Sequence, residues 1–368
     1  MKIARSVHPL PGESERKARL LGLLDAFGGR RIVVLGDLIA DEFIYGQISR
    51  VSREAPVLIL KYDATEVAAG GAGNAANNVA ALGGTARLVG IAGRDDQGRR
   101  MIRSLHRRVE SRRVLRPASW QTPVKTRILA GGVHSAKQQV VRVDRERAWH
   151  GTAADRRGLQ DRLRQAVDDC DGVIVSDYGL GLVTPDLVAF LQRLVAGRTR
   201  RRPVPILIDS RYDLLAYRGL TAATPNETEV EQLLGVTIDD DPQVLERAGR
   251  AILRRTGMRA VLITRGSRGM ALFEPGTPTA AIPIFGTDEI ADVTGAGDTV
   301  IATMAMALAC GASFFEAARL ANYAGGLVVM KRGTASVTAE ELADAVERDH
   351  PTPVEAWSQE GPEQGRRA

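Results

Sequence analysis

Residues 31–36 read Arg-Ile-Val-Val-Leu-Gly, a short apolar run rich in β-branched side chains. Continuous apolar runs of this length are typical of strands buried on both faces of a sheet. Four later runs share the pattern: Ala86–Gly90, Gly172–Ser176, Pro205–Asp209 and Ala260–Thr264. Segments with helical spacing lie between them, at Gln97–Arg108, Ala154–Asp168, Asp186–Leu194 and Val244–Thr256. This alternation predicts an α/β fold of three layers (α/β/α), with a mostly parallel central sheet covered by helices on both faces.

Two segments break the alternation. Residues 57–67 and 123–143 have the period-two pattern of strands with one buried face. In the second segment Val124, Thr126 and Ile128 face one way and Lys125 and Arg127 the other, and Gly131-Gly132 is a plausible turn. No helix is available to cover these strands. We therefore expect a small β-sheet lid, near 42–67 and 120–145, that could cover a site or pair with another subunit.

The pattern of elements predicts one domain over residues 30–350, with a leader at 1–29 and a flexible tail at 351–368. The first residues lack the apolar run of a secretory signal. The longest uncharged stretch, 299–315, is interrupted by Thr, Gly and Ser, which favours a buried helix over a membrane span. Cys170 and Cys310 lie far apart and indicate reduced core residues. We expect a cytoplasmic protein.

The charge balance is basic, with Lys+Arg 50 against Asp+Glu 44, a net charge of +6. Such a balance suits nucleic acids, membrane surfaces or small phosphorylated substrates. The arginines are scattered, with short clusters such as residues 198–202, and aromatic residues make up only 4% of the chain. Without interleaved aromatics to stack on bases, we expect no nucleic acid and no membrane as partner, and favour a phosphorylated small molecule.

The strongest chemical pattern is Asp-Val-Thr-Gly-Ala-Gly-Asp-Thr at 292–299, directly before an Ala- and Met-rich apolar run. The small residues Gly295, Ala296 and Gly297 let backbone N–H groups converge at a helix start, which predicts an anion hole. Asp298 is placed to take the proton of a hydroxyl that attacks a bound phosphate. The alternative is that Asp298 only caps the helix after a glycine turn. The complete octapeptide favours the catalytic interpretation.

Two further clusters could bind hydroxyl groups. Gly70 and Gly71 begin a glycine-rich loop that continues through Asn74 into an amphipathic helix. The loop lacks the spacing of a dinucleotide fingerprint and the lysine of a P-loop, so these enzyme classes are disfavoured. Asp37 and Asp41 follow the strand at 31–36, at the edge where open α/β sheets bind ligands. Carboxylates accept hydrogen bonds from sugar hydroxyls. The alternative for each aspartate is that it caps a turn, an alternative that is stronger for Asp37 than for Asp41.

A nucleotide is suggested by two segments that each follow a strand. Residues 264–269 read Thr-Arg-Gly-Ser-Arg-Gly and could wrap a phosphate tail. Asn226 and Glu229 lie three residues apart, on one face of a helix, where they could hold water around Mg²⁺. A capping box explains the same spacing equally well. The five histidines show no metal-binding spacing.

Taken in order, Gly-Gly-x-x-Asn at 70–74 and the octapeptide at 292–299 resemble the ribokinase family of carbohydrate kinases, over roughly residues 31–346. The resemblance implies transfer of the γ-phosphate of ATP to a sugar hydroxyl, with Mg²⁺ as cofactor. It leaves open whether a monovalent cation is also required. It makes Asp298 the base and Gly295, Ala296 and Gly297 the anion hole. The substrate residues it implies are Asp37, Asp41, Gly70, Gly71, Asn74, Lys125, Arg127, Arg142 and Asp177. Those implied for ATP and Mg²⁺ are Asn226, Glu229, Thr264, Gly266, Gly269 and Asn322.

Within the family, the chain is most similar to the kinases of ADP-heptose synthesis, on residues 36–57, 93–98, 125–127, 138–144, 176–181 and 331–335. Those kinases phosphorylate the anomeric hydroxyl of D-glycero-β-D-manno-heptose 7-phosphate. The resemblance implies a homodimer formed through the lid. Many such kinases carry a fused C-terminal nucleotidyltransferase. This chain ends earlier, so we expect a stand-alone kinase whose product passes to a separate nucleotidyltransferase.

Two departures bear on the acceptor. Leu180 stands where heptose kinases usually have Lys in Asp-Tyr-Gly-Lys-Gly, and Asp209-Ser210-Arg211 replaces Asp-Pro-Lys. The positive charge for a distal phosphate would then come from Arg211, or from Lys125, Arg127 and Arg142 in the lid. A kinase for another sugar phosphate, such as a hexose phosphate, is the alternative. A non-catalytic sugar or nucleotide sensor on the same fold is a second one, but it would not need Asp298.

Overall fold

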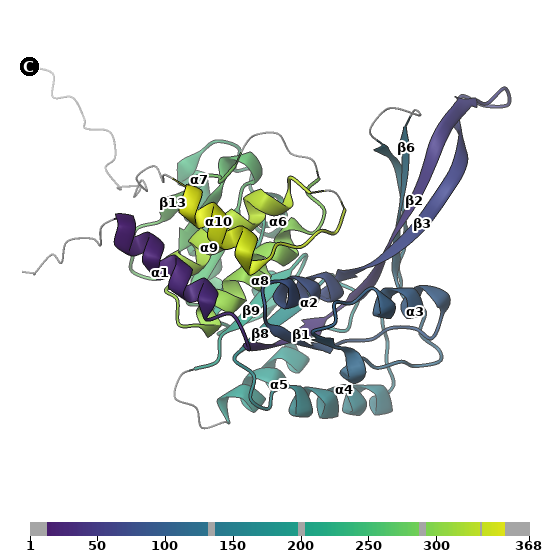
Figure 1. Ribbon diagram of the computed structural model, residues 1–368. Helices are drawn as coiled ribbons and strands as arrows, with labels where there is room; N and C mark the ends of the chain where they lie inside the picture. Colours follow the sequence, from purple (N-terminus) through teal and green to yellow (C-terminus); the bar gives the residue numbers. More distant parts are fainter. Residues whose placement is uncertain (1–12, 132–136, 198–202, 287–291, 332, 350–368) are drawn as a thin grey trace, which may run out of the picture.

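The computed structural model describes residues 13–131, 137–197, 203–286, 292–331 and 333–349. Nine strands of this part of the chain form the main sheet, in the order β13-β12-β11-β10-β9-β8-β1-β4-β5 (Figure 1). All neighbours are parallel except at one edge, where β12 and β13 turn back antiparallel. The strands are β1 (Arg31–Gly36), β4 (Thr85–Val89), β5 (Val109–Glu110), β8 (Gly172–Asp177), β9 (Ile206–Ser210), β10 (Ala222–Ala223), β11 (Ala260–Thr264), β12 (Met270–Phe273) and β13 (Ala280–Ile282).

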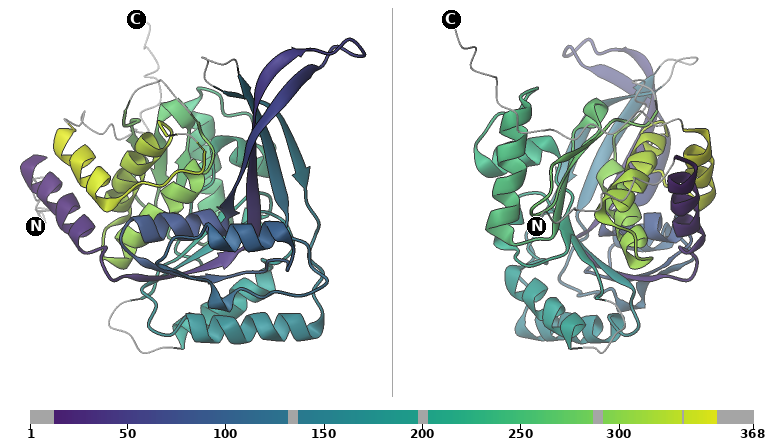
Figure 2. Two further views of the ribbon diagram at one scale, coloured as in Figure 1. Left: turned by 45° about the vertical axis from the view of Figure 1, so that its right-hand side comes forward. Right: turned by 90° about the vertical axis from the view of Figure 1, so that its left-hand side faces the viewer.

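Helices cover both faces of this sheet, as Figure 2 shows from two sides. Ile32 and Val34 of β1 pack into one core, and Val33 and Leu35 into the other, so the predicted three layers are confirmed. The first core contains α1 (Glu13–Asp25), α2 (Ala72–Ala81), α3 (Asp96–Arg103), α8 (Ala296–Ala309), α9 (Phe314–Val328) and α10 (Ala339–Arg348). The second contains α4 (Ala153–Ala166), α5 (Pro185–Ala196), α6 (Glu227–Leu234) and α7 (Pro242–Thr256). Short 3₁₀ turns lie at Ser111–Arg113, Leu214–Ala216 and Gly266–Arg268.

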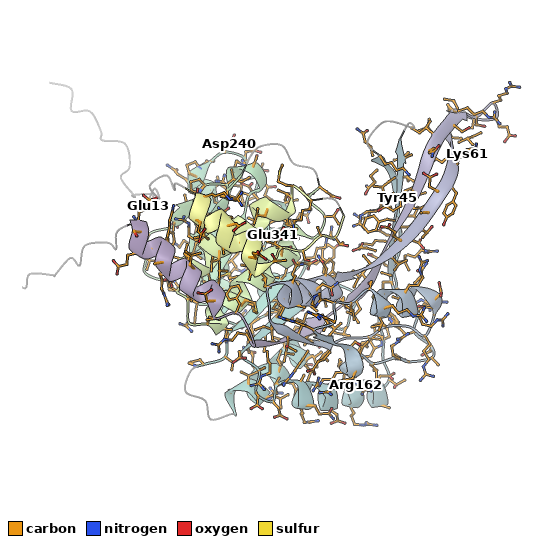
Figure 3. The ribbon with its side chains drawn as sticks, viewed as in Figure 1. Glu13, Tyr45, Lys61, Arg162, Asp240 and Glu341 are labelled. Atoms are coloured by element: carbon orange, nitrogen blue, oxygen red, sulfur yellow. The ribbon has the colours of Figure 1, made fainter. Side chains whose placement is uncertain are left out.

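A second sheet of four strands projects from the body, as the sequence predicts (Figure 1). Its order is β3 (Leu58–Gly71), β2 (Leu38–Val51), β6 (Val124–Gly131) and β7 (Gln138–Arg145). Tyr45 and Lys61 both lie on the projecting part of this lid, Lys61 nearer to its tip (Figure 3). Gly132, the second residue of the predicted turn, lies outside the described residues.

The register of the lid decides which side chains face the body. Lys125 pairs with Asp41 and Arg127 with Arg142, and directly opposed residues share a face of a sheet. These residues line the cavity described below. Ile128 pairs with Val141, so both lie on the opposite face. The predicted alternation of β6 is therefore confirmed.

Two expected boundaries differ from the structure. Residues 13–25 of the expected leader form α1, which buries Leu20, Leu23 and Leu24 and contacts α10. Leucines three and four residues apart give this helix an apolar stripe, so it belongs to the folded body rather than to a leader. The helix expected at 97–108 ends at Arg103. The side chain of Asn77 accepts the backbone N–H of His106 at 2.8 Å, which fixes the chain in another direction.

The apolar segment after Asp298 forms α8, and its residues 298–307 are buried. At 14 residues, α8 is shorter than the roughly 20 residues that span a bilayer. Within the described ranges, no helix has both the length and the apolar character for a membrane crossing. The prediction of a buried helix is confirmed.

Candidate active site

A cavity of about 540 Å³ lies where the carboxyl ends of the main strands meet the lid. Most predicted site residues lie on its wall, although they come from segments more than 200 residues apart. They are Asp41, Gly71, Asn74, Lys125, Arg127, Arg142, Asp177, Asn226, Glu229, Thr264, Gly266, Gly269, Gly295, Ala296, Gly297, Asp298 and Asn322. Asp37 and Gly70 are the two predicted residues that do not line it.

Asp298 lies at the start of α8 and is 4% exposed. Its carboxylate accepts hydrogen bonds from Asn74 Nδ2 at 2.8 Å and from the Tyr178 hydroxyl at 3.3 Å. The residue that precedes the helix, Gly295, has φ of +79°, and a Cβ there would lie 2.5 Å from Asn74 Nδ2. No side chain caps the helix start. The helix-cap alternative for Asp298 is therefore wrong, because its carboxylate faces partners from other elements.

Burial raises the pKa of Asp298 to about 7, and the negative charge of Asp41 adds to this effect. The hydrogen bonds from Asn74 and Tyr178 act in the opposite direction, since they stabilise the ionised form. A carboxylate that ionises near neutral pH is well matched to accept a proton from an alcohol. The backbone around Gly295 and the start of α8 supplies positive potential beside it.

Asn74 is engaged in a network that ties α2 to α8. Its Nδ2 is occupied by Asp298, and Asn78 Nδ2 donates to the Asn74 backbone oxygen at 3.0 Å. The Thr299 hydroxyl donates to Asn78 Oδ1 at 2.9 Å. Asn74 thus orients the carboxylate in addition to lining the cavity where the sugar is predicted.

The predicted sugar side of the cavity is built around Asp41. Its carboxylate pairs with the guanidinium of Arg127, which lies 5.5 Å above the ring of Phe43. Burial raises the pKa of Asp41, and Arg127 opposes this shift. A Cβ on Gly70 would lie 2.2 Å from Asp41 Oδ2, so this glycine makes room for the carboxylate. Gly70 is thus important for the position of Asp41, while its predicted contact with the sugar stays a prediction.

Asp37, the second predicted substrate residue outside the cavity lining, is engaged by backbone groups of the protein. Its carboxylate accepts the backbone N–H groups of Tyr178 at 2.9 Å and Leu180 at 3.2 Å, and it is 3% exposed. Burial raises the pKa of Asp37 to about 7. Asp37 therefore fixes the loop after β8, the capping interpretation that the sequence left open. Leu180, whose side chain is also buried, does not line the cavity.

Asp177 lines the cavity but is already engaged by protein groups. Its carboxylate accepts the hydroxyls of Ser210 at 2.8 Å and Tyr217 at 2.7 Å, and the N–H of Gly179 at 3.0 Å. These bonds join the ends of β8 and β9. Any contact of Asp177 with substrate would use a remaining lone pair of the carboxylate.

The predicted nucleotide side opens into a second hollow of about 380 Å³, shared by Arg211, Asn226, Glu229, Thr264 and Gly266. Asn226 and Glu229 form a complete capping box, with side-chain to backbone distances of 2.8 and 2.9 Å. Both side chains also line the main cavity. The two interpretations of their spacing are therefore compatible: the capping box fixes α6 and presents Glu229 to the cavity.

Sequence reasoning missed two residues on the cavity wall, Tyr178 and Asp209. Burial raises the pKa of Asp209 well above its usual range, and the charges of Glu229 and Asp298 raise it further. The position of Asp209 at the carboxyl end of a parallel strand was a signal that could have found it. Tyr178 lies in the Asp-Tyr-Gly stretch at 177–179 that supports the heptose-kinase resemblance, but that resemblance gave it no role. Within the described residues, no group of three or more His, Cys, Asp or Glu could hold a metal ion.

The cations of the lid are matched by carboxylates. Lys125 pairs with Glu146 and lies 3.3 Å from Asp144, and Arg142 Nε donates to Asp144 at 2.8 Å. The hydrogen bond from Arg142 lowers the pKa of Asp144 to about 2. With Arg127 paired to Asp41, the lid face of the cavity is close to neutral overall.

The raised pKa of Asp298 gives stability a specific pH dependence. The folded-state pKa, about 7, exceeds the usual 3.8, so the folded protein holds the proton more tightly and loses stability as pH rises between these values. Asp298→Asn removes this cost. We expect the free energy of unfolding of the variant to exceed that of wild type by up to about 4 kcal/mol at pH 8. The gain should shrink as the pH falls to 5.

Urea unfolding at both pH values measures this difference. Asp25→Asn, at the exposed end of α1, is the matched control and should track wild type at both. An Asp298→Asn difference of equal size at pH 5 and pH 8 would contradict the assigned ionisation.

Solved structures with the same fold include ribokinase of Arabidopsis thaliana in complex with ribose and ATP, with a TM-score of 0.66 and 20% identity. The match covers 88% of this chain and 100% of that one. Phosphofructokinase-2 of Escherichia coli in complex with potassium has a TM-score of 0.68 and 17% identity, over 87% and 98% of the two chains. At these identities the likeness shows the fold alone, which is ribokinase-like.

Curated relatives are more similar in sequence. Bifunctional protein HldE of Geobacter sulfurreducens is 37% identical over 325 residues, which are 88% of this chain and 64% of the relative. Bifunctional protein HldE of Caulobacter vibrioides is 42% identical over 321 residues, 86% of this chain and 63% of the relative. The chain thus spans a little less than two thirds of the length of these relatives. The model of the pfkB family carbohydrate kinases matches residues 30–341, and the chain belongs to this family.

Proposed function

We propose that this chain is an ATP-dependent sugar kinase that phosphorylates the anomeric hydroxyl of D-glycero-β-D-manno-heptose 7-phosphate to give the 1,7-bisphosphate. The observation that carries the proposal is the buried carboxylate of Asp298 beside the amide-lined start of α8, in one cavity with Asp41 and Glu229. The similarity to the relatives named HldE and to heptose kinases supports this acceptor.

In the proposed reaction, the acceptor oxygen attacks the γ-phosphorus of ATP. The bond from that phosphorus to the β–γ bridging oxygen breaks, ADP leaves with the electron pair, and Asp298 receives the hydroxyl proton. Asp41 is in position to accept a hydrogen bond from another sugar hydroxyl. We assign the backbone N–H groups of Gly295 and Gly297 to stabilise the charge that develops on the transferred phosphoryl group. The N–H of Ala296 donates to the Val293 carbonyl at 3.2 Å, so its predicted part in the anion hole would need this bond to break.

We assign ATP to the side of the cavity that carries Thr264, Gly266, Gly269 and Asn322, because this side opens into the second hollow. Mg²⁺ would offset phosphate charge there. Asp209 and Glu229 suit such an ion, since burial and their mutual repulsion raise the pKa of Asp209 and a cation would relieve both effects. We assign most of the ligands of Mg²⁺ to water and phosphate, as is usual for this ion. A monovalent cation stays a prediction.

The acceptor's distal phosphate is assigned to the lid. Lys125, Arg127 and Arg142 lie on the same side of the cavity as Asp41, while Arg211 shares the second hollow with Asn226. Arg211 is therefore assigned to the phosphates of ATP. Carboxylates pair with the lid cations in this structure, so a substrate phosphate would have to compete with them. Binding of the phosphate would therefore require the lid side chains to rearrange.

A coupled ADP-release assay over phosphorylated and free sugars tests the acceptor. We expect kcat/KM for the heptose 7-phosphate to exceed that for unphosphorylated heptose by at least about 100-fold, because charge-assisted contacts to phosphate are lost. Equal activity on free sugars would contradict a sugar-phosphate site. A preference for a hexose phosphate would favour the alternative acceptor that Leu180 and Ser210-Arg211 leave open. No ADP release with any sugar would favour a sensor.

Asp298→Asn tests the base. The amide keeps the shape of the side chain and can still accept from Asn74, so the variant should fold and bind ATP with near wild-type affinity. We expect turnover to fall by at least about 1,000-fold, since the acceptor proton has no carboxylate to receive it. Calorimetry with ATP and the ADP-release assay measure the two properties. Near-normal turnover would remove the proposed base.

We propose a cytoplasmic homodimer in which the lids of two copies pair. The face of the lid that points away from the cavity carries Ile44, Ile128, Val141 and Val143. Val141 and Val143 are 45% and 48% exposed, and every residue of β7 is exposed. Apolar residues concentrated on one strand face are typical of a protein interface. A nucleotidyltransferase, as in the fused relatives of the heptose kinases, would act on the product.

Val141→Asp tests this dimer, since a charge on the apolar face would be buried between two lids. We expect light scattering at micromolar concentration to give twice the chain mass for wild type and the single mass for the variant. Val236→Asp is the matched control, an exposed valine outside the lid, and should stay dimeric. A monomeric wild type would argue against lid pairing.

A further inference from the structure

Tyr178 lies in the cavity wall directly after β8. Its hydroxyl lies 3.3 Å from Asp298 Oδ1 and 3.5 Å from Asp298 Oδ2. An ionised carboxylate only accepts hydrogen bonds, so the phenol is the donor. Asn74 donates to Oδ2 alone, at 2.8 Å. The two donors come from different parts of the chain, Asn74 from α2 and Tyr178 from the loop after β8.

The position of the phenol is fixed by its surroundings. The Asp37 carboxylate accepts the backbone N–H of Tyr178 at 2.9 Å. The ring lies against Gly71, where an added Cβ would be 3.4 Å from Tyr178 Cε2. Asp37 and Gly71 both belong to the sequence patterns first read as sugar-binding, and both help to hold Tyr178. The glycine-rich loop and the first strand thus contribute to the base through this tyrosine.

The negative charges around Asp298 disfavour its ionised form, so a hydrogen-bond donor to its carboxylate has a large effect there. Asp41 faces it from β2 and Asp209 from β9, and both repel the ionised form. Arg127 from β6 is paired with Asp41. Burial and these nearby carboxylates raise the pKa of Tyr178 well above its usual value, so the phenol keeps its proton over the working pH range.

We propose that Tyr178 is a positioning residue for the base: its hydroxyl bonds to the Asp298 carboxylate and, together with Asn74, holds it ionised and aimed at the acceptor hydroxyl. This inference rests on the proposed kinase function. It predicts that removal of the Tyr178 hydroxyl shifts the pH dependence of phosphoryl transfer. If the ring were only structural, the pH dependence would stay unchanged.

The pH profile of kcat/KM for Tyr178→Phe tests the role. Loss of the donor destabilises the ionised carboxylate, so the limb on which activity rises with pH should move to higher pH by about one unit. The variant should be about tenfold slower than wild type at pH 6 and nearly equal to it at pH 9. Tyr212→Phe, which removes an exposed hydroxyl close by, is the matched control and should keep the wild-type profile.

A fluorinated tyrosine at position 178 gives an independent test that keeps the ring and the hydroxyl. Fluorine makes the phenol a stronger donor, so the same limb should move to lower pH. Opposite shifts in the two variants support the proposal. A uniform loss at all pH values with an unmoved limb, an unchanged Tyr178→Phe, or shifts in the same direction would overturn it. If Tyr178→Phe does not fold, the fluorinated protein alone tests the proposal: a limb at lower pH supports it, and an unmoved limb overturns it.

These outcomes are separate from failure of the kinase proposal. Absence of phosphoryl transfer in wild type, or retained turnover in Asp298→Asn, would remove the function or the base. Overturning the role of Tyr178 requires an active wild type with a measurable limb, and leaves Asp298 as the base.

Discussion

A carboxylate buried at the start of α8 is the feature around which the cavity is built. Burying a charge without partners is costly, because water's solvation is lost. Here Asn74 and Tyr178 supply hydrogen bonds, and the helix start supplies positive potential. The compensation is incomplete, so the pKa of Asp298 rises to about 7 rather than staying near 4. An acid held at this point can exchange a proton under neutral conditions.

The parallel sheet explains why distant residues meet at this carboxylate. Parallel strands end at the same edge, so the residues after β1, β8 and β9 lie together. The lid adds Asp41, Lys125 and Arg127 from above that edge. The lid cations Lys125 and Arg127 are each paired with a carboxylate, so the lid adds little net positive charge to the cavity. Under the proposed function, recognition of a phosphorylated substrate would therefore require rearrangement of the lid.

Much of the fold could be predicted because buried strands have uniformly apolar sequences, as at 31–36 and 260–264, where the bounds agree with β1 and β11. The anion hole could be predicted from the octapeptide at 292–299 because few residues other than glycine and alanine fit so close to an anion. The end of α3 could not be predicted, because the chain after it is held by a hydrogen bond from the His106 backbone N–H to the side chain of Asn77 in another helix. Likewise, Asp37 and Asp41 look equivalent in sequence. Only the backbone amides of Tyr178 and Leu180, brought up by β8, separate their roles.

The ionisation of Asp298 can be observed directly by infrared difference spectroscopy of wild type against Asp298→Asn between pH 4 and pH 9. The stretching band of a protonated, buried carboxyl should be present in acid and disappear with a midpoint near pH 7. A midpoint near pH 4, the value of an ordinary solvated aspartate, would show that the carboxylate is not held as described and would contradict the account.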